Sequence, residues 1–302
     1  MPGTVLTGAD TLVLFGFETN YRVEAETNLP FGKAVSISSA DKNNNLEALY
    51  GDGKRAAEDT DVKKYEMSFT AEWKLASAAI FPAIFGPKNA DGSYDVELGP
   101  QPITVGVATK VGSKNMLQIY TGCVCSEAKC TINTDGSMGI SATFQASKMD
   151  LREGTLPKVY DAKSIYTFAE CNWHVNGTRQ SNVSNVELSI NHGVALNYEI
   201  GTRFAAGYKC GSLEVSASLT HQYDGEDYLK STFGGDTPQE SGPAVLPCKL
   251  VLNSFHDNPD ITFELKNARI NTYGSPWKAG DVVEESLNII GEDLTVTITE
   301  GA

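Results

Sequence analysis

Apolar and polar side chains alternate with a period of two along several segments of this 302-residue chain. Side chains of a strand point to opposite faces in turn, whereas a helix repeats every 3.6 residues. The alternation predicts strands with one solvated face at residues 65–73, 138–144, 213–220, 261–265 and 294–298. Helical periodicity is confined to residues 76–85, which contain Pro82, and to residues 224–233, which end at Gly234. We therefore predict an all-β fold with two short helices.

An internal repeat is visible when the chain is shifted by 148 positions. Tyr50 then falls on Tyr198 and Arg55 on Arg203, and the strands at 65–73 and 213–220 align in phase. A chance alignment of two β segments is the alternative explanation. We predict two tandem β units, residues 1–155 and 156–302, with the boundary near 154–160. Each unit is expected to be a β-sandwich or half-barrel with one short helix and its own core.

The chain is acidic, with 24 Lys and Arg against 38 Asp and Glu, a formal net charge of −14. Residues 1–155 carry 14 basic and 19 acidic side chains, and residues 156–302 carry 10 and 19. Such a chain lacks the basic surface that grips DNA or an anionic membrane. The longest apolar stretch, 75–86, is too short to span a bilayer. The N-terminus has no basic segment and reaches Asp10 early, so we expect no signal peptide.

Residues with catalytic or metal-binding chemistry form no recognisable motif, so we expect neither an enzyme nor a cofactor. The four His residues, at 174, 192, 221 and 256, have no metal-ligand spacing. Cys123, Cys125 and Cys130 are compatible with buried thiols, a zinc site or a hairpin disulfide. The segment 89–95 has oxygen ligands at alternate positions, as calcium loops do, but lacks the closing Glu.

Three segments carry a family resemblance: 46–55, its counterpart 194–203, and the helix with its Phe-Gly end at 228–234. The Tyr120–Cys123 segment adds a Gly-Cys strand. Together they resemble the tail tube (major tail) proteins of long-tailed viruses, here with two units per chain. Such proteins contribute four strands per unit to an inner barrel that six units close into a ring.

The resemblance implies a trimer with pseudo-sixfold symmetry, and stacked rings that form the tail tube of the virion. At about 4.8 Å per strand, about 24 strands give a circumference near 115 Å and a diameter of at least about 37 Å. That leaves room for a DNA duplex roughly 20 Å across, which would pass without specific binding. The implied partners are further copies of the chain and the tape-measure, tail-terminator or baseplate proteins, with assembly in the host cytoplasm and no membrane.

The resemblance also implies that the excursions 43–64 and 191–210 contact the neighbouring ring. We therefore take Tyr50, Lys54, Arg55, Tyr198 and Arg203 as candidate inter-ring or inter-subunit contacts.

The lumen is expected to be acidic or neutral, because DNA must slide through it. The opposite possibility is a basic wall formed by Lys110, Lys114 and Lys129. The alternatives to a tail tube are an extracellular β-sandwich binding or surface-layer module, and an enzyme on a β scaffold.

Overall fold

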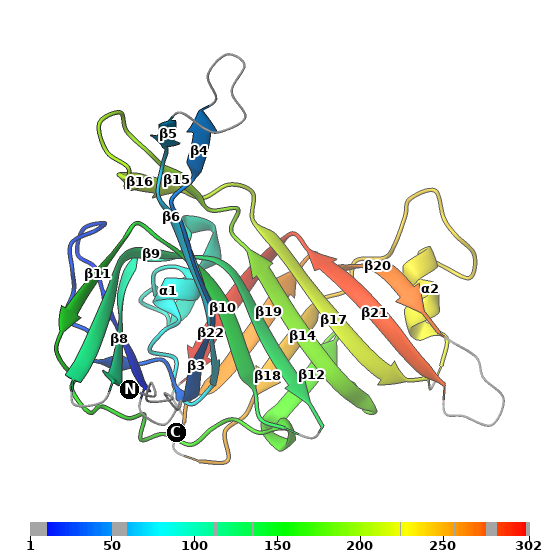
Figure 1. Cartoon of the computed structure of the whole chain (residues 1–302). Coiled ribbons are helices and arrows are strands. Elements are labelled where there is room, and N and C mark those ends of the chain that lie inside the picture. The colour runs from blue at the N-terminus through cyan, green and yellow to red at the C-terminus, as the bar shows by residue number, and fades with distance from the viewer. Residues whose placement is uncertain are drawn as a thin grey trace.

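Strands dominate the computed structural model, which describes residues 11–49, 59–111, 114–134, 136–223, 225–256, 258–275 and 283–299 (Figure 1). The largest feature is a long, curved antiparallel sheet of eight strands, called the long sheet below. Its order is β3 (Lys33–Asn43), β6 (Glu66–Lys74), β10 (Gly139–Ala146), β9 (Lys114–Asn133), β14 (Val183–Asn191), β17 (Glu214–Gln222), β21 (Glu284–Gly291) and β20 (Arg269–Gly274).

Two smaller sheets cover one face of the long sheet. The first shares the N-terminal half of β9 and consists of β2 (Leu29–Pro30), β1 (Thr11–Phe17), β8 (Ile103–Val111), β9 and β11 (Lys148–Glu153). The second consists of β13 (Thr178–Arg179), β12 (Cys171–Val175), β18 (Cys248–Leu252), β19 (Asp260–Lys266), β22 (Asp293–Thr299) and β7 (Ser93–Asp95).

Strand β9 can belong to two sheets because it turns sharply at Gly122. There φ is +63°, a value that glycine adopts without strain. A Cβ at this position would lie 2.9 Å from the Cβ of Ser147 and 3.0 Å from the ring of Tyr21. Residues up to Thr121 pair with β8 and β11, Cys123 pairs with Ile103 of β8, and residues from Val124 onward pair with β10 and β14.

The apolar core lies between the long sheet and the two smaller sheets. Strand β6 shows the pattern that builds it, because Met67, Phe69, Ala71 and Trp73 are buried and the residues between them are not. Helix α1 (Pro82–Phe85) is buried in the same core, where Phe85 packs edge-on against Phe263 of β19. Burial of aromatic side chains on this scale supplies much of the driving force for folding.

The predicted all-β class is confirmed, and the five predicted strands lie in β6, β10, β17, β19 and β22. The helices are shorter than predicted. Residues 76–78 are irregular, residues 79–81 form a turn, and the first helix begins only at Pro82. The second, α2 (Asp227–Phe233), ends at Gly234 with φ +77°, as the sequence indicates. Two 3₁₀ turns, η2 (Val96–Leu98) and η3 (Phe168–Glu170), complete the helical elements of the described residues.

The two halves of the long sheet have the same strand order. Each half pairs its first, second, fourth and third strands in succession: β3, β6, β10, β9 and then β14, β17, β21, β20. Strands β6 and β17 begin and end 148 positions apart. Nevertheless, one continuous apolar cluster runs from Val13 to Val296 through both halves. The expectation of two separate cores is therefore wrong, because β14 pairs with β9, and β7 of the first half pairs with β22 of the second.

Two hairpins project from one end of the long sheet, at the top of Figure 1. The arm, β4 (Leu46–Leu49) with β5 (Asp59–Val62), joins β3 to β6. The short hairpin, β15 (Ala195–Asn197) with β16 (Gly207–Lys209), joins β14 to β17.

Candidate functional site

The face of the long sheet that points away from the core is polar. The register places uncharged and acidic side chains opposite one another across successive strands. One such row is Thr70, Thr143, Glu127, Asn191 and Glu214. Within it the hydroxyls of Thr70 and Thr143 lie 3.0 Å apart. A continuous polar row of this kind gives a sheet a hydrated surface that is not used for the chain's own packing.

Acidic side chains outnumber basic ones on this polar face. The acids are Asp41, Glu66, Glu72, Glu127, Glu187, Glu214 and Glu284. The bases are Lys33, Lys74, Lys129 and Arg269. Lys129 lies 3.6 Å from Glu127, so part of its charge is balanced within the face. Lys110 lies on β8 and Lys114 on the other half of β9, so these two lysines do not lie on the polar face with Lys129.

Each lateral edge of the long sheet is a strand with one described neighbour. Strand β3 pairs only with β6, and β20 pairs only with β21, among the described residues. Such edges carry backbone groups that are free to pair with another strand. Because the sheet alternates strictly and has an even number of strands, β20 and β3 run in opposite directions. They therefore suit antiparallel pairing between two copies.

Of the five candidate contact residues, Tyr198 and Arg203 are described, and Tyr50, Lys54 and Arg55 lie outside the described residues. Arg203 Nε donates to the Lys63 carbonyl (2.9 Å), and its Nη2 donates to the Asn44 carbonyl (3.1 Å). Tyr198 donates its hydroxyl to the Tyr65 carbonyl (3.0 Å). The loop of the short hairpin is therefore hydrogen-bonded to the base of the arm within one chain.

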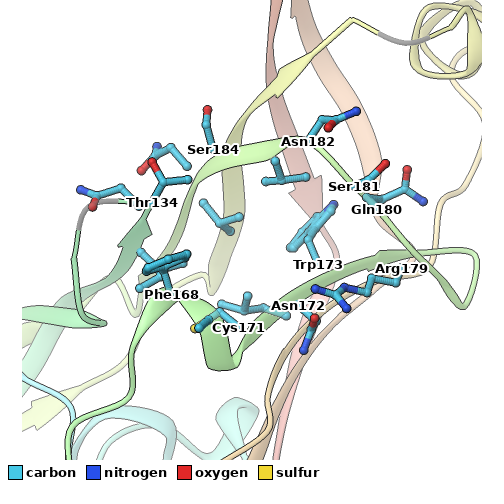
Figure 2. A pocket seen from close by; sticks show the side chains of 17 residues that line it. Thr134, Phe168, Cys171, Asn172, Trp173, Arg179, Gln180, Ser181, Asn182 and Ser184 are labelled. Carbon is cyan, nitrogen blue, oxygen red and sulfur yellow. The ribbon is translucent and has the colours of Figure 1, made fainter.

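A pocket of about 530 Å³ lies at the other end of β14, near η3 and β12 (Figure 2). Trp173 and Phe168 lie on opposite sides of it, and Arg179, Gln180 and Asn182 lie along one side. No sequence motif indicates this pocket, because strands far apart in the chain contribute to it. The exposed aromatic Phe168 is the one local signal, and it is not distinguishable from an ordinary core residue in the sequence.

Several cysteine and histidine side chains are buried in the core. Burial raises the pKa of the Cys130 thiol to about 12, and Cys123 and Cys125 are likewise buried free thiols. Burial lowers the pKa of His192, whose Nε2 lies 2.7 Å from the Ile84 carbonyl oxygen. The described residues contain no group of three or more His, Cys, Asp or Glu placed to hold a metal. No helix within the described ranges has the length and apolar character needed to cross a bilayer.

A protein-family model described as phage tail tube protein matches residues 8–288, nearly the whole chain. The chain belongs to the phage tail tube protein family. A search of curated proteins found no match. A tail tube protein is a structural component of the virion tail and assembles with itself into a tube. Membership in this structural family favours the tail tube interpretation over a surface-layer module or an enzyme.

Proposed function

We propose that three copies of the chain close into a ring in which the long sheets form one barrel of about 24 strands. The observation that carries the proposal is the long sheet itself, with a core-facing apolar side and a polar side. At each lateral edge, β3 or β20 pairs with one strand, and no described strand pairs with its outer side. Pairing of β20 with β3 of the next copy would remove both edges from every chain. The polar face would line the bore.

The pairing between the two halves of one chain is a template for the pairing between chains. Strands β14 and β3 occupy equivalent places in the two halves, as do β9 and β20. Within the chain, Asn191 lies opposite Glu127. Asn43 is the equivalent of Asn191, because it lies opposite Glu66 as Asn191 lies opposite Glu214. Thr272 of β20, which lies opposite Asn288, is the equivalent of Glu127 by register. The ring interface would then place Asn43 opposite Thr272 of the neighbouring copy.

This equivalence also supports two tandem units, residues 1–155 and 156–302, that arose by internal duplication. Their fusion makes a ring of three chains pseudo-sixfold. In the proposed tube the rings stack through the arm and the short hairpin, including Tyr50, Lys54, Arg55, Tyr198 and Arg203. DNA passes through the bore without specific binding, and tape-measure and tail-terminator or baseplate proteins meet the ends of the tube. Assembly takes place in the host cytoplasm.

Cross-linking tests the ring directly. The variant carries Asn43→Cys and Thr272→Cys in a Cys210→Ser background, because Cys210 is an exposed thiol. A short thiol cross-linker applied to assembled protein is expected to give a covalent ladder that ends at three chains. The single-cysteine variants, as controls, should give no ladder. A ladder that ends at six chains, or tubes in which the pair does not cross-link, would refute the proposed ring.

A further inference from the structure

The tip of the short hairpin presents an apolar side chain to solvent. Ile200 is more exposed than any other large apolar residue described, at 108% relative accessibility. Its neighbour Glu199 is exposed as well and has no ion-pair partner among the described residues. An isolated exposed apolar residue is ordinary, but one at the tip of a projecting hairpin beside an unpaired acid is a suitable docking element.

The pocket near η3 has complementary chemistry. Its floor includes the apolar side chains of Ile132, Val186 and Leu250. The indole N–H of Trp173 is buried and has no hydrogen-bond acceptor among the described residues. Arg179 is the one charged residue among those that line the pocket, and it has no described ion-pair partner. An apolar side chain with a negative charge beside it would therefore complement the pocket.

The hairpin tip and the pocket lie at opposite ends of the same strand. The pocket includes Val183–Val186 at the start of β14, and the short hairpin follows the end of β14. Strand β14 is nine residues long, about 30 Å, and the hairpin lies beyond the end of the strand that is farther from the pocket. The tip therefore cannot reach the pocket of its own chain. A projecting hairpin at one end of a subunit and a complementary pocket at the other end allow a head-to-tail contact, and repeated head-to-tail contacts generate filaments.

We propose that Ile200 of one copy occupies the pocket of a copy in the adjacent ring, with Glu199 paired to Arg179. This inference rests on the proposed function and adds the acceptor site for ring stacking. The occupant is a second copy of this chain, selected by charge complementarity at the rim and apolar contact at the floor.

A charge swap tests the pairing. Glu199→Arg and Arg179→Glu, made singly, place like charges at the contact. Each is expected to raise the critical concentration for tube growth by about tenfold, the size of a close charge-pair coupling. The double variant restores the opposite charges and is expected to return the critical concentration to within about threefold of wild type. Lys209→Glu, on the same hairpin but away from its tip, is the matched control and should leave growth unchanged.

Different outcomes of this experiment test the proposed docking site and the proposed ring separately. Both residues are exposed, so near-wild-type urea denaturation should confirm that the variants fold. The docking site is refuted if the single variants grow tubes like the wild type, or if the double variant does not regain wild-type growth. Neither result would refute the proposed ring, provided that the wild type still forms rings and tubes. A wild-type protein that forms neither rings nor tubes overturns the proposed function itself. Arg203 donates a hydrogen bond to the Lys63 carbonyl at the base of the arm within its own chain. Substitution of Arg203 would therefore not distinguish loss of the docking site from loss of the arm's own structure.

Discussion

At the scale of single residues, buried carboxylates with complete hydrogen bonding fix the loops that join the sheets. Glu170 is 1% exposed and accepts hydrogen bonds from the Thr167 N–H (2.7 Å) and hydroxyl (2.9 Å), and from the Phe255 N–H (2.8 Å). Burial alone would raise the pKa of Glu170, but the hydrogen bonds outweigh it and lower the pKa. This carboxylate thereby ties η3 to the loop that follows β18.

Replacing Glu170 by Gln should lower the free energy of unfolding by about 1–3 kcal/mol at pH 7, because the amide nitrogen cannot accept from the backbone N–H groups. Because its pKa is lowered on folding, the wild-type carboxylate stabilises the fold at pH values above 4.5, the ordinary pKa of a glutamate. This contribution is lost as the pH falls through the pKa of the folded state. Urea denaturation at pH 7 and pH 4 measures both effects. The exposed Glu240→Gln is the control, and equal effects of the two substitutions would contradict this account.

At the scale of elements, the turn of β9 at Gly122 is the joint between two sheets. Gly122→Ala should lower the free energy of unfolding by roughly 2 kcal/mol or more, because alanine is strained at φ +63° and its Cβ would meet Ser147 and Tyr21. Gly207→Ala is the matched control, since nothing lies within 4 Å of its Cβ position. Urea denaturation of both variants at neutral pH measures the difference. A Gly122→Ala protein as stable as the control would show that β9 does not depend on this conformation.

Strands were predictable from sequence wherever one face is solvated. The alternation places β6 and β17 within two residues of their observed bounds. The prediction of a helix at residues 76–81 was wrong, because the periodicity of a short apolar run does not distinguish a helix from irregular structure. The three residues of β7 pair with a strand about 200 positions away, and no local pattern predicts such a partner. The pocket around Trp173 was not predictable either, because residues of β9, β12, β14 and β18 line it together.

At the scale of the whole molecule, the polar face combines an acidic excess with many uncharged hydroxyl and amide groups. Unassembled wild-type protein should not bind duplex DNA, with a dissociation constant weaker than about 10⁻⁴ M at physiological salt, because no basic surface releases counterions. A gel-shift titration at low and physiological salt measures this. Tight wild-type binding that weakens steeply with salt would mean that the wall attracts DNA.

A charge-reversed face provides the positive control for that titration. Replacing Glu127, Glu187 and Glu214 by Lys reverses three acids in adjacent strands of the polar face. This variant should bind duplex DNA more tightly and with a steeper salt dependence than one in which Glu240, Glu264 and Glu292, off that face, are replaced by Lys. Equal binding by the two variants would contradict a distinct role for the polar face.

A cryo-electron microscopy map of the assembled tube tests the central claim most directly. We predict threefold rings whose inner wall is a continuous barrel, with β20 of each chain paired to β3 of the next and with the side chains of Glu127 and Lys129 facing the bore. A map in which these side chains face outward, or in which a gap separates β20 from β3, would contradict the account.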